Sequence, residues 1–398
     1  MKLKKLLAIF LVVALVVACG ALLAACKPEA GGEEKVLRVA VVTSPSGVDD
    51  GNFNYDVWRG VERFEEKAKD YGYDKIQKTN VNIQSLEWDA ALKPAIENIV
   101  TEYDVIILSG YQFGKKDLKT IAEANPKVAF MLIDSFMADE NFNELSARNV
   151  YAVQFKEQES GFLAGVAAAL QSTSKKVAVV NGIAYPSNIN YQYGFYSGVN
   201  YVNGLKHGTE GWTPVDIIEL EDYKDENAFG NYLGSFTDAG LGKNCGQALI
   251  AAGCDIIFVA AGGAGNGVFT AAKEATSNVK VIGCDANEWK SGYKSGELGA
   301  NVVLTSALKV LNKAVFDALV DYSRHIFQGG QNLYLDAKGD YTGYVKEDGS
   351  QQLSAATIAV MDTAYAAIKA GTIVPAATGT ENTFAGFAGD ATPTPART

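Results

Sequence analysis

The chain has 398 residues, of which 48% are hydrophobic and 20% are charged, and its formal net charge is −11 at neutral pH. A chain of this length exceeds what one hydrophobic core usually fills, so we expect two domains or lobes. The acidic balance argues against nucleic acid or another phosphate polymer as a partner.

The N-terminal segment has the features of a secretory signal peptide. Three of the first five residues are lysines, an apolar run extends from Leu6 to Ala18, and the sequence LLAAC ends at Cys26. A transmembrane anchor is the alternative, but Cys19 and Gly20 interrupt the apolar stretch and polar residues follow Cys26 directly. We therefore expect the chain to be exported.

The residues before Cys26 also resemble the lipobox of bacterial lipoproteins, in which the cysteine becomes the lipidated first residue of the mature protein; Cys19 is a weaker competing site. We expect residues 1–26 to form a lipoprotein signal peptide and residues 27–35 to form a flexible tether. Acyl chains, and not a spanning helix, would then hold the protein on the outer face of the cell membrane, or on the periplasmic side in a host with two membranes.

Only three cysteines follow position 26, namely Cys245, Cys254 and Cys284. An odd number without close spacing indicates neither a disulfide framework nor a zinc site, and each of the three falls in or beside an apolar segment. We expect buried thiols and no bound metal.

In chain order, the first element is the β-rich run 36–43, followed by a helical pattern in which Val57, Val61, Phe64 and Tyr71 recur at helical spacing. The same unit of a strand and a helix then repeats along the chain. The further predicted strands are 104–110, 127–134, 175–182, 215–220, 254–262 and 279–285. Short, uninterrupted apolar strands that alternate with helices predict parallel sheets covered on both faces, so the fold class is α/β.

A helical segment at 157–171 separates two such series of strands, which indicates two similar lobes with a break near residue 155. The remaining chain is expected to form a long helix at 307–328, a hairpin within 333–345 and a final helix at about 354–370. Residues 386–398 are rich in threonine and proline and are expected to be a disordered tail.

Polar residues follow the predicted strands, where open parallel sheets bind their ligands. They occur at 44–58, 110–113, 134–135, 181–182, 262–267 and 285. Two lobes with such edges face to face would enclose carboxylates, amides, glycines and aromatic rings, which suits a neutral polar ligand with a flat part.

The glycine-rich stretch GGAGNG at 262–267 lies between a predicted strand and a predicted helix. Its spacing is not that of a dinucleotide-binding fingerprint, and no phosphate-binding lysine follows it. We expect no cofactor there, and propose that these glycines let backbone amides approach a ligand closely.

Seven blocks of the sequence occur in a recognisable order. They are GVDDGNFNYDVWRG, NVYAVQFKEQESGFLAGVAAAL, YGFYSGV, GSFTDAGLGK, AAGGAGNGVFTAAKEA, VIGCDANEW and VLTSALKVLNKAVFDAL. In order and spacing they resemble the basic membrane protein family, the PnrA-like substrate-binding lipoproteins of nucleoside ABC transporters. The resemblance covers about residues 38–325.

The resemblance implies a type I periplasmic-binding-protein fold, in which two Rossmann-like lobes with parallel sheets close on one ligand and are joined by three crossing segments. Lobe 1 would comprise 36–155 with part of 285–325 returning to it, and lobe 2 would comprise 156–284 with part of 326–385. Such a protein captures a nucleoside, with a purine preference in several relatives, and delivers it to a membrane permease. We expect a monomer that binds a nucleoside and that permease.

The resemblance also suggests the contacts. Asp134 and Asp285 end predicted strands and match sugar-contacting aspartates, and carboxylates accept hydrogen bonds from both hydroxyls of a diol. Lys309 matches a family lysine positioned toward the sugar, and Asp50 and Asn54 are candidates to read the base edge. The remaining candidates are Phe53, Trp58, Tyr191, Phe195 and Phe236 for stacking on the base and Gly263 for backbone contact.

Several of these residues have a plainer interpretation. Trp58 also fits the apolar stripe of the first helix, while Phe195 and Phe236 fit packing against a sheet. Many relatives place Phe where Tyr191 aligns, which leaves base selectivity open.

Two other functions are weighed against nucleoside capture. An exported nucleoside hydrolase would need an acid, a base or a metal held by clustered acids, but the chain has only His207 and His325 and no G-x-S-x-G sequence. We therefore do not expect an enzyme. A sugar or autoinducer receptor of the same fold is the second alternative, and it would lack a pair of aromatic residues around a base or would use a single aromatic platform.

Overall fold

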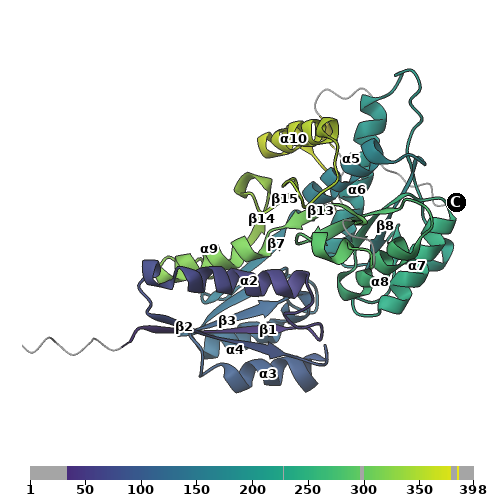
Figure 1. Cartoon of the computed structure of the whole chain (residues 1–398). Coiled ribbons are helices and arrows are strands. Elements are labelled where there is room, and N and C mark those ends of the chain that lie inside the picture. The colour runs from purple at the N-terminus through teal and green to yellow at the C-terminus, as the bar shows by residue number, and fades with distance from the viewer. Residues whose placement is uncertain (1–33, 227, 296–299, 378–382, 385–398) are drawn as a thin grey trace, which may run out of the picture.

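The protein is described here by a computed structural model, which covers residues 34–226, 228–295, 300–377 and 383–384. These residues form two lobes, each built on a mainly parallel sheet (Figure 1). The expected signal peptide (1–26) with Cys26, residues 27–33 of the tether, and the tail 386–398 lie outside the described residues. Within the described ranges, no helix combines the length and the apolar character needed to cross a membrane.

The sheet of lobe 1 has six strands, and all of its neighbouring pairs are parallel. In spatial order they are β14 (Gln331–Leu335), β7 (Val150–Phe155), β4 (Ala129–Ile133), β3 (Val105–Ser109), β1 (Val36–Thr43) and β2 (Lys75–Asn82). Strands β3 and β4 are buried along their whole length, as expected for central parallel strands covered by helices on both faces.

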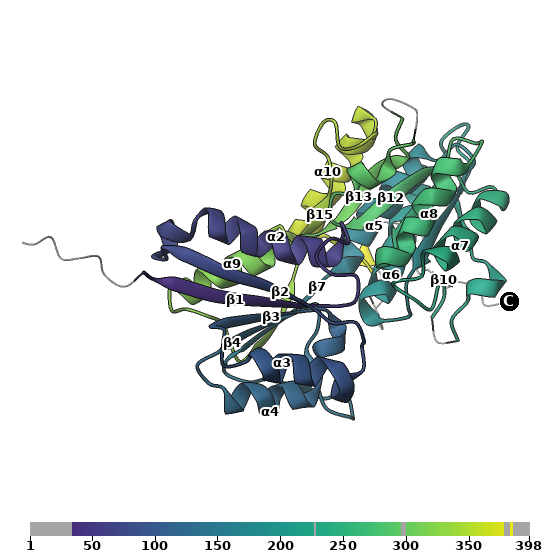
Figure 2. The same ribbon diagram turned by 60° about the horizontal axis from the view of Figure 1, so that its bottom comes forward.

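Helices cover both faces of this sheet (Figures 1 and 2). On one face lie α2 (Phe53–Glu66) and α9 (Leu311–Ser323), and on the other lie α3 (Lys93–Ile99) and α4 (Lys116–Ala124). Val57, Val61 and Phe64 of α2 are fully buried against the sheet, which confirms the helical stripe expected there. Tyr71 follows in a separate short 3-10 turn, where its ring stacks on Phe64.

The sheet of lobe 2 runs in the order β10 (Asn231–Tyr232), β8 (Lys176–Asn181), β11 (Ile256–Ala260), β12 (Lys280–Asp285), β13 (Val303–Lys309) and β15 (Thr342–Tyr344). A further short strand, β9 (Asp216–Ile217), pairs with β8. All pairs are parallel except that of β13 with β15.

Helices again cover both faces of this second sheet (Figures 1 and 2). On one face lie α5 (Glu157–Gln171) and α6 (Pro186–Leu205), with α10 (Ala355–Ala370) packed outside α5, and on the other lie α7 (Ala239–Ala251) and α8 (Gly262–Glu274). Helices α5 and α6 pack backbone to backbone. A Cβ atom at Gly165 would lie 2.2 Å from the carbonyl oxygen of Phe195, and one at Gly198 would lie 2.0 Å from that of Phe162. Only glycine permits this approach, which brings the starts of both helices to the same edge of the sheet.

The remaining described elements are short. Two antiparallel ribbons pair β5 (Met137–Ala138) with β6 (Glu144–Leu145) and β16 (Ile373–Val374) with β17 (Thr383–Phe384). Single turns of 3-10 helix are η1 (Ala68–Tyr71), η3 (Tyr111–Phe113), η4 (Glu221–Tyr223), η5 (Trp289–Gly292) and η6 (Ala337–Gly339), and a π-helical turn, η2 (Trp88–Leu92), precedes α3.

The chain passes between the lobes three times within the described residues: between β7 and α5, between β13 and α9, and between β14 and β15. The crossing segments are hydrogen bonded to one another. Lys156 N donates to Leu335 O at 2.9 Å, and Val310 N donates to Tyr341 O at 2.8 Å. The Glu159 carboxylate in the first turn of α5 accepts hydrogen bonds from Ala337 N and Thr342 Oγ1, both at 2.7 Å.

In the C-terminal part, the bounds of one expected helix and the existence of one expected hairpin are wrong. The helix expected at 307–328 begins only at Leu311, because β13 continues to Lys309 between β12 and β15; a short apolar run does not by itself distinguish a strand from a helix. The hairpin expected within 333–345 does not form. Its two halves, β14 and β15, belong to different lobes, so the returning part of lobe 1 extends beyond residue 325 to β14.

Candidate ligand-binding site

A cavity lies between the two lobes at the carboxyl ends of their strands. It encloses about 820 Å³ of space between protein atoms, part of which is open to solvent. From lobe 1 it is lined by Ser44, Pro45, Ser46, Asp50, Phe53, Asn54, Leu86, Ser109, Gly110, Tyr111, Gln112 and Asp134. From lobe 2 it is lined by Tyr185, Ser187, Asn188, Tyr191, Phe236, Thr237, Ala260, Gly262, Gly263, Cys284, Asp285 and Lys309.

Asp134 and Asp285 occupy equivalent positions in the two lobes. Asp134 follows the last residue of β4 and Asp285 is the last residue of β12, and their φ angles are 66° and 62°. This left-handed conformation is uncommon for residues other than glycine, although aspartate and asparagine tolerate it best. Backbone strain of this kind concentrates at functional sites, where the surrounding structure holds it in place. Both residues line the cavity.

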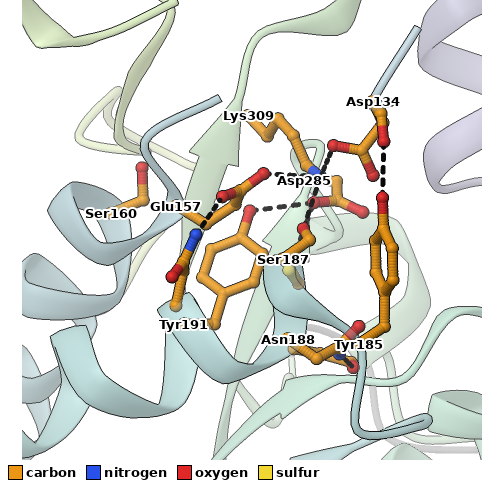
Figure 3. Close-up of polar contacts among 12 residues, drawn as sticks. Asp134, Glu157, Ser160, Tyr185, Ser187, Asn188, Tyr191, Asp285 and Lys309 are labelled. Atoms are coloured by element: carbon orange, nitrogen blue, oxygen red, sulfur yellow. Dashed lines mark hydrogen bonds and ion pairs between the residues drawn. The ribbon is translucent and has the colours of Figure 1, made fainter. Parts of the chain in front are cut away.

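Lys309, at the end of β13, is the centre of a buried cluster of polar side chains (Figure 3). Its ammonium group donates to Asp134 Oδ1 at 2.7 Å, to Ser187 Oγ at 3.0 Å and to Glu157 Oε1 at 3.3 Å. The Lys309 side chain is only 2% exposed. Because an ammonium group has three hydrogens, these contacts use all of its donors.

The cluster holds more negative than positive charge. Burial lowers the pKa of Lys309, but the carboxylates of Asp134, Glu157 and Asp285 outweigh burial and raise it well above the ordinary value, so the ammonium stays charged. Burial also raises the pKa of Asp134 above its ordinary value, against the opposing effect of Lys309. A single cation therefore faces three carboxylic groups, and a further negative charge in the cavity would be repelled.

Asp285 is held by neutral groups of its own lobe. Its Oδ1 accepts a hydrogen bond from the Tyr191 hydroxyl at 2.9 Å and a weaker one from Cys284 Sγ at 3.3 Å. Within the described residues, Asp285 Oδ2 accepts no hydrogen bond, and neither does Asp134 Oδ2. Each lobe thus offers one unoccupied carboxylate oxygen at the cavity.

Asp50 and Asn54 line the cavity but are largely engaged with the protein. Asp50 accepts hydrogen bonds from the backbone amides of Asn52, Asn54 and Tyr55 and from the Asn54 side chain. Asn54 in turn donates to Ser44 Oγ at 3.0 Å and accepts from Ser109 Oγ at 2.9 Å. Both side chains therefore shape the turn that leads into α2, with little capacity left to read a base edge.

Five aromatic residues line the cavity. Phe53 and Tyr111 belong to lobe 1, and Tyr185, Tyr191 and Phe236 belong to lobe 2. The rings of Tyr111 and Tyr185 contact each other across the lobes with a centroid distance of 4.7 Å, and the Tyr185 hydroxyl donates to Asp134 O at 2.8 Å. The Phe236 ring packs over Gly182, where a Cβ atom would lie 2.2 Å from its edge.

Two of the expected ligand contacts lie outside the cavity. Trp58 packs against the core of lobe 1, its Nε1 donates to Glu62 Oε1 at 3.0 Å, and Lys78 Nζ lies 5.1 Å from its ring centroid. Phe195 is fully buried in lobe 2 and stacks on Phe258. Each points from its helix toward a sheet, so both are packing residues.

The sequence alone gave no reason to single out Glu157, Tyr185 or Ser187. Glu157 opens α5, where an acidic residue usually favours the helix N-terminus and stays exposed, yet its side chain is 2% exposed. Tyr185 and Ser187 lie at the start of α6, on either side of Pro186. The expected contact Gly263 does line the cavity, beside Phe236. Among the described residues, no group of three or more histidine, cysteine or acidic side chains is arranged to hold a metal ion.

Comparison with known proteins identifies the family of this chain. The sequence model of the PnrA-like ABC transporter substrate-binding proteins matches residues 37–205 and 229–376. The chain belongs to this family. It is therefore a substrate-binding protein of an ABC transporter, whose role is to bind a solute and present it to permease subunits.

Curated relatives agree with this membership over most of the chain. The chain is 29% identical over 352 residues to the CD4+ T-cell-stimulating antigen of Listeria monocytogenes, covering 84% of this chain and 88% of that protein. It is also 29% identical to the ABC transporter nucleoside-binding protein BmpA of Lactococcus lactis, with 82% and 87% of the two chains covered. Basic membrane protein A of Borreliella afzelii is 27% identical, with 81% and 86% covered.

Solved structures confirm the fold of an ABC solute-binding protein. A solute-binding protein from Aeropyrum pernix K1 matches with a TM-score of 0.67 and 22% identity, covering 85% of this chain and 92% of that chain. A periplasmic solute-binding protein from Actinobacillus succinogenes with bound D-allose matches with a TM-score of 0.55 and 15% identity, covering 79% and 99%. At such low identity these likenesses show the fold alone, so the ligand must be inferred from the site.

Proposed function

We propose that the protein captures a nucleoside between its two lobes and delivers it to the permease of an ABC importer. The observation that carries the proposal is the pair of strand-end aspartates, one from each lobe, in a cavity that is also lined by aromatic rings from both lobes. The likeness to BmpA of Lactococcus lactis, a nucleoside-binding protein of an ABC transporter, supports it.

The ribose is assigned to Asp134 and Asp285. The unoccupied Oδ2 atom of each would accept hydrogen bonds from ribose hydroxyls, and hydrogen bonds to charged acceptors are among the stronger ones in proteins. Lys309 would act through Asp134, because all three of its donors are engaged with protein groups. Lys309 is then a positioning residue whose contact with the sugar is indirect.

The base is assigned to the space between Phe53 and Phe236. These two rings come from opposite lobes and carry no polar group. Phe236 lies beside Tyr111, with a centroid distance of 6.2 Å, whereas Tyr191 is tied to Asp285 and Tyr111 lies closer to Tyr185. A base stacked on an aromatic side chain is stabilised by roughly 1–3 kcal/mol.

The ligand is expected to be unphosphorylated. The cluster around Lys309 contains three carboxylic groups and one ammonium, so a 5′-phosphate would enter a site with surplus negative charge. Nucleoside 5′-monophosphates should therefore bind far more weakly than the corresponding nucleosides.

Isothermal titration calorimetry tests the proposal directly. Protein from residue 27 onward retains every described helix and strand, and it would be titrated with inosine, guanosine, adenosine, uridine, inosine 5′-monophosphate and ribose. Tight binding of one or more nucleosides with none of ribose is the expected result. Binding of free sugar alone would favour the sugar-receptor alternative, and no binding across the panel would refute the proposal.

The base assignment is tested by Phe53→Ala and Phe236→Ala, each expected to weaken nucleoside binding by roughly tenfold because one stacking face is lost. The matched control is Trp58→Phe, which alters an aromatic residue of the same helix outside the cavity. Equal affinity in all three variants and the wild type would refute the assignment of the base to Phe53 and Phe236.

Members of this family are solute-binding proteins, and we propose that this chain likewise performs no reaction on its ligand. Incubation of the protein with inosine, followed by chromatography of the base and the nucleoside, should recover inosine intact. Release of hypoxanthine in proportion to protein and time would instead favour the exported nucleoside hydrolase.

We further propose that the mature protein is exported, lipidated on Cys26 and anchored to the membrane as a monomer. The proposal is supported by the sequence LLAAC, which ends at Cys26 and follows a segment with basic and then apolar residues. Expression in a bacterial host should give membrane-associated protein that partitions into detergent, and Cys26→Ser should move it to the aqueous phase. If Cys19→Ser does so and Cys26→Ser does not, the lipidated residue is Cys19.

A further inference from the structure

A buried contact between the lobes lies outside the cavity, and it joins Asn52 to Glu288. Asn52 Nδ2 donates to Glu288 Oε1 at 3.1 Å. Asn52 is 5% exposed and Glu288 is 4% exposed, and neither residue lines the cavity. Asn52 belongs to the turn between β1 and α2 in lobe 1, and Glu288 follows β12 in lobe 2, so the contact exists only while the lobes are together.

On the lobe 2 side, Glu288 is tied to the backbone beside a proposed ribose ligand. Its second oxygen, Oε2, accepts a hydrogen bond from Cys284 N at 2.8 Å, next to Asp285. Its own amide donates to Ser306 Oγ on β13 at 3.1 Å. The carboxylate also packs over Gly283, where a Cβ atom would come within 2.6 Å of Oε2. Glu288 therefore has one fixed orientation in lobe 2.

On the lobe 1 side, Asn52 belongs to the turn that leads to Phe53, one of the two proposed base contacts. Asp50 Oδ1 accepts a hydrogen bond from Asn52 N, and Asp50 Oδ2 accepts from Asn54 N. Phe53 follows Asn52 directly and begins α2. The buried Oδ1 atom of Asn52 has no hydrogen-bond partner among the described residues. Within these residues, the Asn52 side chain therefore hydrogen bonds to Glu288 alone.

We propose that Asn52 and Glu288 form a latch that holds the Phe53 turn of lobe 1 against the Asp285 end of lobe 2 and so sets how long a captured ligand stays bound. The inference rests on the proposed function, because it concerns retention of that ligand. Both residues are positioning residues, since neither contacts the cavity.

Burial raises the pKa of Glu288 to about 8, and the neighbouring Asp285 and Asp50 add to this shift, while the hydrogen bonds from Cys284 and Asn52 oppose it. A protonated Glu288 would donate to the unpartnered Asn52 Oδ1 after a rotation of the amide by 180°, a change that leaves the contact in place. The latch therefore persists in either protonation state.

The first test is the dissociation rate of inosine, followed by tryptophan fluorescence in a stopped-flow instrument. Asn52→Ala should raise the dissociation rate about fivefold or more with little change in the association rate, because a buried hydrogen bond made only in the closed state is lost. Glu288→Gln should stay close to the wild type, since its amide can accept from Cys284 N and donate to Asn52 Oδ1. The circular dichroism spectrum of ligand-free Asn52→Ala should match that of the wild type, because both backbone hydrogen bonds of Asn52 remain.

The second test introduces a titratable partner. In Asn52→Asp, a carboxylate would face Glu288, with Asp50 and Asp285 also nearby, so dissociation should accelerate as pH rises and both carboxyl groups ionise. Adding Glu288→Gln should abolish much of this pH dependence. A substitution that merely destabilised the protein would not give a pH-dependent dissociation rate that Glu288→Gln reduces.

Unchanged dissociation rates in Asn52→Ala, or a pH profile in Asn52→Asp that Glu288→Gln does not alter, would overturn the latch. If the wild type bound none of the nucleosides, the proposed function would fail separately. Small-angle X-ray scattering of ligand-free protein would then test the latch alone: a larger radius of gyration in Asn52→Ala would support it, and equal radii would overturn it.

Discussion

The two lobes place an aspartate at the same point of the fold but hold it in different ways. Asp134 of lobe 1 receives its side-chain hydrogen bond from Lys309 of lobe 2, and its carbonyl oxygen accepts from Tyr185, also of lobe 2. Asp285 of lobe 2 is held by Tyr191 and Cys284 of its own lobe. Closure of the lobes therefore determines the environment of Asp134, whereas that of Asp285 is present in lobe 2 alone.

The largest effect is expected from Lys309→Met, which would leave Asp134 and Glu157 buried without a cation. Removing one partner of a buried ion pair typically costs about 3–5 kcal/mol, so the free energy of unfolding should fall by that order. Urea denaturation measures it. The control is Lys313→Met, whose partner Asp317 is partly exposed, as is Lys313 itself, and whose loss should cost less than about 1 kcal/mol. Similar losses in the two variants would contradict a special role for Lys309.

The second prediction separates the two aspartates. Asparagine tolerates the left-handed conformation, so Asp134→Asn and Asp285→Asn avoid backbone strain. Both should weaken nucleoside binding by roughly ten- to hundredfold, since each removes a charged acceptor. Only Asp134→Asn should also lower the free energy of unfolding, because only Asp134 pairs with the buried Lys309. Calorimetry and urea denaturation of both variants check this, and full affinity in both would refute the ribose assignment.

The third prediction concerns pH. Burial raises the pKa of Glu288 from its ordinary value of 4.5 to about 8. The part of this shift that arises when lobe 1 covers the carboxyl group makes closure take up a proton. The protonated carboxyl favours the closed state. This contribution to closure is fully present below pH 4.5 and is lost as pH rises through about 8. Nucleoside affinity should therefore fall between pH 6 and 9, by less than about tenfold per pH unit. Glu288→Gln should have a shallower profile, and calorimetry at several pH values measures the difference. Parallel profiles would show that Glu288 does not titrate on closure.

The smallest effect is expected from Tyr191→Phe, which removes one neutral hydrogen bond to Asp285 and keeps the ring. Affinity should fall by about two- to tenfold, corresponding to roughly 0.5–1.5 kcal/mol. An unchanged affinity would show that Asp285 keeps its orientation without this hydroxyl.

Much of the fold was predictable because the strands are short, apolar and separated by helices. The expected strands at 36–43, 254–262 and 279–285 correspond to β1, β11 and β12, and α5 and α10 begin within one residue of the expected positions. The parallel α/β class follows from the same alternation, because strands that helices cover on both faces of the sheet are apolar along their whole length.

The candidate site was only partly predictable. Asp134 and Asp285 were identifiable because a carboxylate at the end of an apolar strand needs a partner. Trp58 and Phe195 were not assignable, since an aromatic residue on a helix next to such a strand can face either the sheet or the ligand. The roles of Asp50 and Asn54 depended on which hydrogen bonds the local turn uses, which only coordinates display.

The sequence by itself determined the alternation of strands and helices, the two lobes and the strand ends that carry the polar residues, because these depend on periodicity and neighbouring residues. The tertiary structure alone decided that β14 and β15 separate into different lobes. It also decided that Lys309 joins Asp134 and Glu157, and that Asn52 meets Glu288. These residues are 152 to 236 positions apart. Contacts over such separations depend on how distant segments pack within lobe 2 and between the two lobes, which no local pattern encodes.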